Sequence, residues 1–475
     1  MNLPKNFFII FLIFSHLSWA NNLPDLGEFS DQFISPYQEK MIAREILYQV
    51  HSSPDVVQDE EINDYLKFLG DKLVANSENP QRDFTFFVLK DESINAFAML
   101  GGLIGVHTGL FISADNESEI ASVLGHEIAH VTQKHLQRVI AKQDRDKYKS
   151  IFLLAIGLLA ARSNPQAAAG AMMASQAMNV QNFLDYTREH EQEADRIGID
   201  ILYKSGYNVG SAIDFFNTLQ KGSRFSPSGP SYLRTHPITS DRISDITNRL
   251  KDYPYQYVNN SNYFHFVRGK IRALYSTDKN VKTFEKNLKN KTYVNLEGEK
   301  FALAIAYLRE NRINDSEKIL NDLEKEKNPL VANLKISILL KGNKNQEALV
   351  ELEKLLIKYP LYKAYIYRWA EINLLLENFI EVKDTLQQYI FKYNSDPYLY
   401  KLLAKAFKGQ KKDLEYHENM GEYYYHQFNL KDAIIQFDIA KKIKSNDFYA
   451  KSRVESRLKQ LQAEQLMFEE GRKNK

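Results

Sequence analysis

The sequence contains no cysteine among its 475 residues. Disulfides, thiolate metal ligands and a lipid-modified cysteine are therefore excluded. An excess of one charge is missing as well, because 62 lysines and arginines stand against 60 aspartates and glutamates. Chains that bind nucleic acids or other polyanions usually carry a clear basic excess. The composition therefore gives no support for a nucleic acid partner.

Long apolar runs are also missing. Ile151 to Ala161 and Ala167 to Met178 are apolar, but Arg162 and Pro165 separate them. A helix that crosses a bilayer needs about 20 consecutive apolar residues, so we expect no transmembrane span. For this region we favour two core helices, and the alternative is a lid that covers a binding cleft.

The first twenty residues differ in character from the rest. Lys5 supplies positive charge, an apolar core runs from Phe7 to Phe14, and Ser18 to Ala20 ends in small residues. This pattern is typical of a secretory signal peptide that is cleaved after Ala20. An uncleaved anchor is the alternative, but the apolar core is too short for a span. Export to the periplasm is the expectation.

The remaining chain divides near Pro254. Residues 21–255 mix strand-like and helical patterns, including a strand at Phe84 to Leu89 and a second strand with a hairpin over Ala96 to Phe111 around Gly101 and Gly102. Residues 256–475 are almost wholly helical in pattern. We therefore predict an α+β domain with a small sheet, followed by an all-α domain.

The second part carries an internal repeat. The pair Glu347-Ala348 recurs as Glu381-Val382 after 34 residues, and a further copy contains Asp432-Ala433. Such a period is typical of tetratricopeptide repeats, whose helical pairs bury their faces by stacking and present a concave surface to protein partners. From Val382 to Ala433 the interval is 51 residues, or 34 plus 17, which predicts one extra helix in the stack.

The main chemical signal is a His-Glu-x-x-His motif formed by His126, Glu127 and His130. Asn116 and Glu119 form a plausible helix start before it. Histidines four residues apart lie on one face of a helix and can bind one metal ion, while the neighbouring glutamate reaches a water on that ion. Two ordinary surface histidines are the alternative, so a third ligand has to decide.

A second helical segment supplies that ligand. Glu191, Ala194, Asp195 and Gly198 fall on one face of it, and the small residues allow close approach to another helix. Glu191 is the expected third ligand, and Asp195 is expected to accept a hydrogen bond from His126 or His130. Glu193 lies about 200° around the helix from Glu191, so we expect it to be solvated. A charged surface helix is the alternative.

With these motifs the chain resembles the HtpX-like gluzincin peptidases. The resemblance implies one zinc ion held by His126, His130 and Glu191, with Glu127 as general base and acid and Asp195 behind the ligands. A signal peptide with a catalytic domain and C-terminal tetratricopeptide repeats resembles a periplasmic branch of that family. For that branch, the resemblance implies misassembled outer-membrane β-barrel proteins as substrates and the outer-membrane assembly machinery as partner.

Two further segments share the resemblance. Thr235-His236-Pro237 with Arg242 is similar to a histidine-proline segment of the family, in which the histidine approaches the zinc and keeps the enzyme latent. His236 is thus a candidate fourth ligand and switch, and a role in stabilising the transition state is the alternative. Asn95 to Ala98 is similar to the family's edge strand, which pairs with extended substrate.

His135 does not fit the metal face. Five residues after His130 on the same helix, it would point about 140° away from that face, so we expect it at the surface.

The predicted function is zinc metalloendopeptidase. The alternative is a chaperone or adaptor whose zinc centre is structural or latched.

Overall fold

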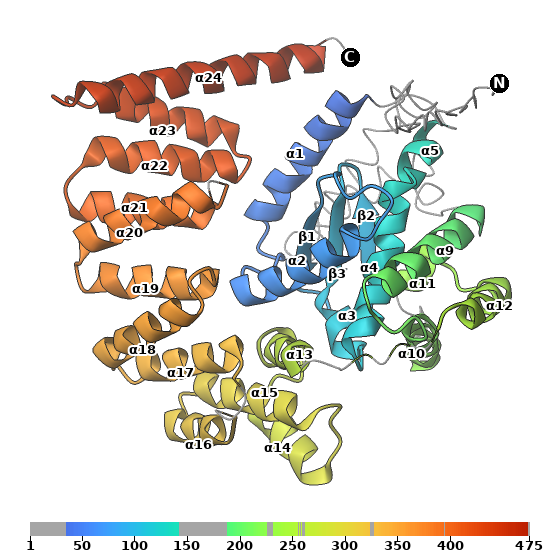
Figure 1. Ribbon diagram of the computed structural model, residues 1–475. Helices are drawn as coiled ribbons and strands as arrows, with labels where there is room; N and C mark the ends of the chain where they lie inside the picture. The colour runs from blue at the N-terminus through green and yellow to red at the C-terminus, as the bar shows by residue number, and fades with distance from the viewer. Residues whose placement is uncertain are drawn as a thin grey trace, which may run out of the picture.

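The computed structural model describes residues 35–141, 188–225, 231–254, 256, 258, 262–323, 327–393 and 395–473. The described residues up to 254, called the catalytic part after the site that the sequence predicts, contain one small sheet. They lie beside an arc of helices from α13 to α24, called the helical part (Figure 1). The fold class is thus α+β followed by an all-helical region, as predicted. The signal peptide and the apolar stretches between Ile151 and Met178 lie outside the described residues.

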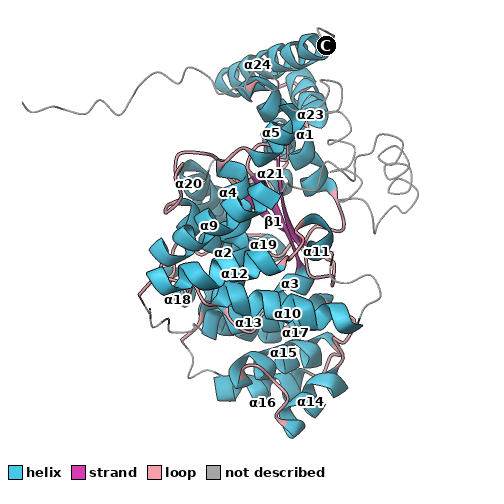
Figure 2. Cartoon of the chain, turned by 90° about the vertical axis from the view of Figure 1, so that its right-hand side faces the viewer, coloured by secondary structure: helices cyan, strands magenta, loops and turns pink. Residues whose placement is uncertain are grey.

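The sheet has three strands in the order β1-β3-β2. β1 (Thr85–Leu89) pairs in parallel with β3 (Leu103–His107), and β2 (Ala96–Met99) pairs antiparallel with β3. Gly101 and Gly102 form the β2–β3 turn with φ angles of +78° and +75°, which glycine adopts without steric cost. The three strands make up only a small share of the molecule, which is mostly helical (Figure 2).

The predicted hairpin is confirmed, but its second strand is shorter than expected. The chain leaves the sheet after His107 and continues as the short helix α3 (Thr108–Ser113). Thr108 donates its hydroxyl hydrogen to the carbonyl of Asp91 at 2.8 Å. The expected extension of the strand to Phe111 is therefore wrong, because Leu110 and Phe111 belong to helix α3, where both side chains are buried.

The central helix is α4 (Glu117–Thr132), and it begins where the sequence predicts. The Asn116 side chain accepts a hydrogen bond from the Glu119 backbone N–H at 3.1 Å and donates one to the Glu119 carboxylate at 2.7 Å. The first bond satisfies a free backbone N–H at the helix start, and the second holds the capping side chain in place. Nearly the whole helix is buried, so it lies in the core of the catalytic part.

Helix α9 (Arg188–Lys204) crosses α4 at a pair of glycines. A methyl group at Gly125 would lie 3.0 Å from the carbonyl oxygen of Gly198, and one at Gly198 would lie 3.0 Å from the backbone nitrogen of His126. The predicted close approach of the Ala194 and Gly198 face is confirmed. It brings the side chains of α9 directly over the histidine motif.

The catalytic part also contains the following helices, of which α1 and α2 precede the sheet and the others follow α4 or α9: α1 (Pro36–Ser52), α2 (Glu60–Val74), α5 (His135–Ala141), α10 (Ser211–Phe225), α11 (Tyr232–Thr235), α12 (Ser240–Arg249) and the 3-10 turn η3 (Leu250–Asp252).

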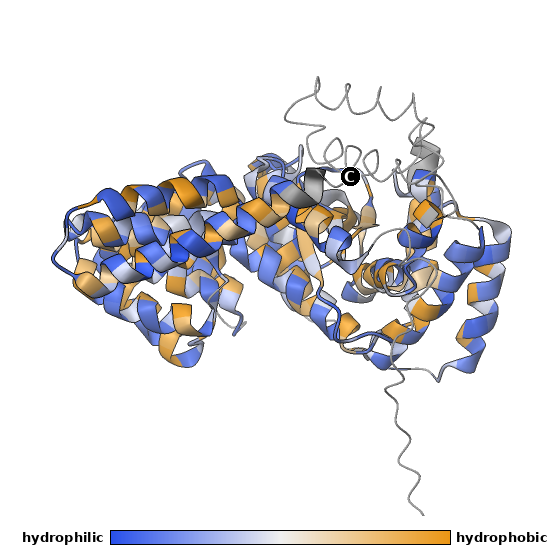
Figure 3. Ribbon diagram, turned by 90° about the horizontal axis from the view of Figure 1, so that it is seen from above, coloured by the Kyte–Doolittle hydropathy of each residue, from blue (hydrophilic) through white to orange (hydrophobic). Residues whose placement is uncertain are grey.

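The helical part is a succession of antiparallel neighbours, which extend sideways from the catalytic part when seen from above (Figure 3). Its helices are α13 (Asn262–Tyr275), α14 (Val281–Asn290), α15 (Leu296–Arg309), α16 (Ile313–Leu323), α17 (Pro329–Lys341), α18 (Asn345–Lys358), α19 (Lys363–Leu375), α20 (Phe379–Lys392), α21 (Pro397–Gly409), α22 (Asp413–His426), α23 (Leu430–Lys442) and α24 (Phe448–Lys473).

One type of turn recurs between these helices. From the turn after α15 onward, a non-glycine residue with φ near +60° occurs at Asn311, Asn343, Glu377, Lys411 and Phe428, so the intervals are 32, 34, 34 and 17 residues. The last interval is half of the period. The insertion of one extra helix between Val382 on α20 and Ala433 on α23 is thereby confirmed.

The two parts share one hydrophobic core. Phe264, Phe266 and Ile271 of α13 are fully buried and belong to the same cluster as Leu124 of α4. Arg268 also donates a hydrogen bond to the carbonyl of Ile112 at 2.7 Å. The division at residue 255 stays a prediction, because the first helices after it complete the core of the part before it.

The far end of the helical arc returns to the catalytic part. Arg44 on α1 pairs with Glu464 on α24 and lies 5.3 Å from the ring centre of Tyr425 on α22. Phe428 stacks on His51 with 5.8 Å between ring centres. Helix α1 thus joins the C-terminal helices to the sheet (Figure 1).

Among the residues that the structure describes, none of the helices combines the length and the apolar character that a membrane crossing requires.

Candidate metal centre

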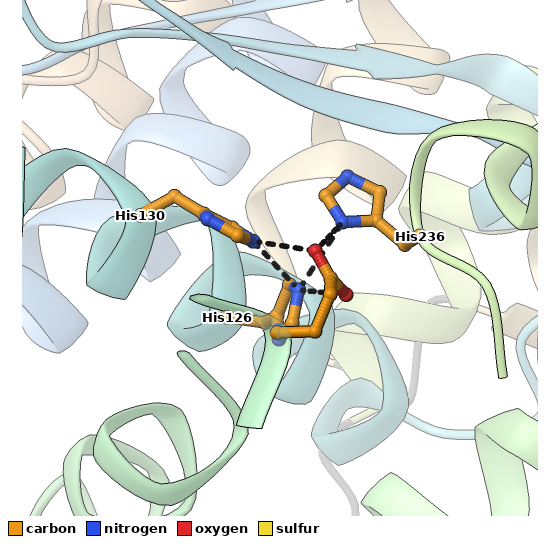
Figure 4. Close-up of side chains that lie close together, drawn as sticks. His126, His130 and His236 are labelled. Atoms are coloured by element: carbon orange, nitrogen blue, oxygen red, sulfur yellow. Dashed lines mark hydrogen bonds and ion pairs between the residues drawn. The ribbon is translucent and has the colours of Figure 1, made fainter. Parts of the chain in front are cut away.

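Four side chains from three segments converge at one point. α4 contributes His126 and His130, α9 contributes Glu191, and the residue that ends α11 is His236. One ligand atom of each lies within 4.8 Å of those of the other three, and all four residues are buried. Figure 4 shows the three imidazole rings turned toward a common centre.

The distances between these atoms suit a single zinc ion. Two atoms that each bind a tetrahedral zinc at about 2.0 Å lie roughly 3.3 Å apart. His126 Nε2 lies 3.0 Å from His130 Nε2 and 3.3 Å from His236 Nδ1. Glu191 Oε1 lies 3.3 Å from His130 Nε2 and 3.0 Å from His236 Nδ1. The donor set of three imidazoles and one carboxylate is also typical of zinc.

Glu127 lies beside this cluster. It is fully buried, and neither carboxylate oxygen accepts a hydrogen bond of ordinary geometry within the described residues, although the Ala98 backbone N–H lies near enough to lower its pKa. Its Oε1 atom is 3.4 Å from His236 Nε2. Burial raises the pKa of Glu127, and the positive fields of His236 and His126 oppose this effect. A buried carboxylate with free acceptor sites is costly unless it has a task.

Asp195 supports the cluster from behind. Its Oδ1 atom lies 3.0 Å from Nδ1 of His126, the nitrogen that faces away from the cluster. Arg242 holds the same carboxylate with Nε and Nη2, both at 2.7 Å, and places Nη1 2.7 Å from Glu191 Oε2. Asp195 thus lies beside one ligand histidine, and Arg242 contacts the carboxylates of Asp195 and Glu191 at once.

The charges favour a cation at the centre. Although burial alone would lower the pKa of His126, Asp195 and Glu191 raise it to about 10. Burial would raise the pKa of Glu191, yet His236, His126 and His130 bring it well below its ordinary value. The pKa of His130 is lowered, first by burial. Metal ions compete with protons for such ligands. The high pKa of His126 therefore indicates that Asp195 and Glu191 stabilise a positive charge at this position.

The expected surface position of His135 is wrong. Its side chain is fully buried, and its Nδ1 atom lies 2.8 Å from Nδ1 of His130. Helix α4 ends at Thr132, Lys134 has φ of +51°, and α5 starts anew at His135. The angle of 100° per residue holds only within one helix, so the break turns His135 back toward the site.

Glu193 also departs from its expected solvation. Its side chain is 27% exposed, and it lies 3.1 Å from His135 Nε2 and 3.0 Å from Arg138 Nη1. Burial lowers the pKa of His135 to about 3, together with the positive field of His130. Glu193 therefore faces α5, on the side of α9 that is remote from the metal ligands.

The sequence linked Arg242 to the histidine-proline segment by resemblance but gave it no role, and it did not single out Tyr232. Arg242 is buried by the turn that carries Pro237, whose carbonyl accepts a hydrogen bond from its Nη1 at 2.8 Å. Tyr232 stacks on His236 with 4.6 Å between ring centres.

Comparison with known proteins agrees with this geometry. Residues 60–250 match peptidase family M48. A putative beta-barrel assembly-enhancing protease of Vibrio cholerae is 35% identical over 64% of this chain and 63% of its own length. The beta-barrel assembly-enhancing protease of Yersinia pestis is 30% identical over 81% of this chain and 80% of its own length. The beta-barrel assembly-enhancing protease of Escherichia coli is 34% identical over 55% of this chain and 54% of its own length.

The match to the Vibrio relative thus covers less than two thirds of that protein, whereas the match to the Yersinia relative covers most of it. The matched region of the family contains all four residues that converge in the structure. The chain therefore belongs to peptidase family M48, and its four-residue cluster is able to bind the zinc ion on which the proteases of this family depend.

Proposed function

We propose that the chain is a zinc metalloendopeptidase that binds one zinc ion through His126, His130 and Glu191, with His236 as a fourth ligand that is exchanged for water. Zinc at this position supplies a Lewis acid that activates water and polarises the scissile carbonyl. Asp195 and Arg242 hold the ligands in place. The ligand spacing near 3.3 Å supports this set.

Glu127 is the general base. The observation that carries the proposal is its fully buried carboxylate, which accepts no hydrogen bond of ordinary geometry within the described residues and lies against the metal cluster. Such a group can take a proton from the attacking water and deliver it to the amine that leaves. A purely structural zinc site has no use for a base beside its ligands.

The exchange of Glu127→Gln tests this role. The amide keeps the shape of the side chain but cannot accept the proton, so casein cleavage should fall by about 100-fold or more, while zinc content and the thermal unfolding midpoint stay at wild-type values. Glu117→Gln is the matched control, because Glu117 lies on the same helix and bonds Tyr65 at 2.7 Å. Unchanged turnover of Glu127→Gln would reject the mechanism.

His236 acts as a latch in this proposal. Its Nδ1 atom lies 3.3 Å from His126 Nε2, where it would bind the zinc in place of a water, and its Nε2 atom faces Glu127 at 3.4 Å. The ring thus covers both the open metal position and the base. Stabilisation of the transition-state oxyanion is the alternative role. The segment from His236 to Thr239 lies between α11 and α12, so it can move without unfolding either helix.

For the cellular role we propose a periplasmic protease that degrades misassembled outer-membrane proteins and assists their assembly. The signal-peptide pattern of residues 1–20 and the names of the relatives, which include enhancement of β-barrel assembly, support this role. The helical part would form the tetratricopeptide stack, and its turn period of 34 residues supports that assignment.

A groove of about 1020 Å³ between the two parts is the proposed contact surface for partners. Glu60 and Asp64 of α2 line it on one side, together with Asp59 directly before that helix, and tyrosines such as Tyr398 and Tyr423 line it on the other. A photo-crosslinking residue at Tyr423 should capture assembly partners, whereas one at Ile357, which is 85% exposed outside the groove, should not. Equal capture from both positions would reject the groove as the contact surface.

A chaperone or adaptor with a permanently latched zinc is the second candidate function. The closed set of four ligands favours it. In that case neither wild type nor His236→Ala would cleave casein, although both would bind partners.

A further inference from the structure

The two ligand histidines of α4 are supported in different ways. His126 directs Nδ1 to the carboxylate of Asp195 at 3.0 Å. His130 directs Nδ1 to another imidazole, His135, at 2.8 Å. The far nitrogen of His135 then lies 3.1 Å from Glu193 Oε2. Glu193, His135 and His130 thus form a chain that ends at the metal position.

The direction of the protons in this chain follows from the metal site. His130 needs a free lone pair on Nε2 to bind zinc, so its proton sits on Nδ1 and is donated to His135. His135 must then accept at Nδ1, and its own proton sits on Nε2 and is donated to Glu193. An ionised carboxylate can only accept, so Glu193 sets the direction of both hydrogen bonds.

We propose that His135 is a positioning residue of the metal centre, which together with Glu193 fixes the tautomer and the ring orientation of His130. This inference rests on the zinc site proposed above. Ligand histidines are commonly oriented by a carboxylate or a carbonyl. Here a carboxylate at the rim of the molecule acts on the ligand through an intervening imidazole.

The surroundings keep His135 in one orientation. The ring of His190 stacks on it with 4.5 Å between centres and an interplanar angle of 20°. His135 is the first residue of α5, directly after the break at Lys134. Arg138, one turn further along α5, pairs with the same Glu193 oxygen at 3.0 Å. Two hydrogen bonds and a stacked ring therefore define the position of the imidazole.

Two substitutions at His135 separate hydrogen bonding from packing. His135→Phe keeps a planar ring in the buried space but cannot accept a hydrogen bond. His135→Asn is smaller and polar, and its amide oxygen can stand where Nδ1 stood. Zinc affinity is measured by competition with a chelator, with the metal alone as ligand, and unfolding of the metal-free chains is followed in parallel.

We expect His135→Phe to bind zinc about 10- to 100-fold more weakly than wild type, the range found when such supporting partners are lost. His135→Asn should recover most of that loss, although it packs less well. A packing role would give the opposite order, so an Asn variant that binds zinc more weakly than the Phe variant would overturn the inference. Wild-type affinity in the Phe variant would also overturn it.

Glu193 provides a test that leaves the core filled, because its side chain is partly exposed. Glu193→Ala should lower zinc affinity several-fold, whereas Arg138→Gln, which leaves the carboxylate on His135, should change it less than about twofold. Equal losses of zinc affinity in the two variants would reject the hydrogen-bonded series from Glu193 through His135 to His130. A wild-type protein that binds no zinc would instead reject the proposed function itself.

Discussion

Removal of the His236 imidazole tests how the centre is controlled. His236→Ala takes away one of four ligand atoms, the one 3.3 Å from His126 Nε2 and 3.0 Å from Glu191 Oε1. His126, His130 and Glu191 remain as a three-ligand site, which is the arrangement that leaves one position for water. The same exchange uncovers Glu127, since His236 Nε2 lies 3.4 Å from its carboxylate.

The expected size of the effect follows from the population of the open state. A minor conformation a few kcal/mol above the closed one is populated at about 0.1–10%, and activity is reduced by that fraction. If wild type is open for about 1–10% of the time, His236→Ala should cleave casein roughly 10- to 100-fold faster. Zinc affinity should fall at the same time, because a ligand has been lost.

The assay is the initial rate of casein cleavage by zinc-loaded chains at equal metal content. Thr235→Val is the matched control, because it changes the residue directly before His236, whose hydroxyl donates to the Tyr232 carbonyl at 3.2 Å and not to the cluster. An oxyanion role predicts the opposite sign, a rate about 100-fold or more below wild type, with zinc affinity unchanged. A slower His236→Ala enzyme would therefore refute the latch.

Three further predictions concern the frame of the site. Gly198→Val should lower the free energy of unfolding by about 1–3 kcal/mol and weaken zinc binding, because the added Cβ would lie 3.0 Å from the backbone nitrogen of His126. Chemical denaturation measures the loss of stability, and chelator competition measures the loss of zinc affinity. Arg242→Gln should cost about 3–5 kcal/mol, the scale for removing one partner of a buried ion pair, since Asp195 loses two hydrogen bonds of 2.7 Å; an unchanged unfolding midpoint would contradict this. Zinc affinity should rise about tenfold per pH unit between about pH 6 and 8. The pKa of His126 in the metal-free chain is raised to about 10, so one proton must leave as zinc binds. A zinc affinity that does not change with pH would contradict this prediction.

The helix-based part of the site could be predicted from the sequence. His126 and His130 share a face of α4 because they are one turn apart, and Glu191 and Asp195 share a face of α9 for the same reason. Gly198 permits the crossing of the two helices. Each of these relations lies within one helix or follows from the size of a residue at its surface, and the repeat period of the helical part is equally local.

His135 could not be placed in this way. No glycine or proline stands between Thr132 and His135, so the sequence gives no sign that the helix breaks at Gln133 and Lys134. Lys134 nevertheless adopts φ of +51°, a conformation that costs energy for a residue with a side chain. Contacts made elsewhere compensate for it, since His135, Leu136 and Ile140 become buried after the break.

The division into two parts could be predicted only in outline, because helical repeats do not reveal what their first members pack against. Phe266 of α13 and Phe301 of α15 form an edge-to-face pair with 5.2 Å between ring centres, inside the cluster that also contains Leu124 of α4. Lys270 of α13 reaches Asp59 at 2.7 Å, just before α2. A chain cut at residue 255 would expose this apolar surface. The helices of the arc up to α17 therefore share one apolar core with the metal-binding helices. The later helices contact the catalytic part through separate polar contacts, such as Lys363 of α19 with Glu60 of α2 at 2.8 Å and Glu464 of α24 with Arg44 of α1.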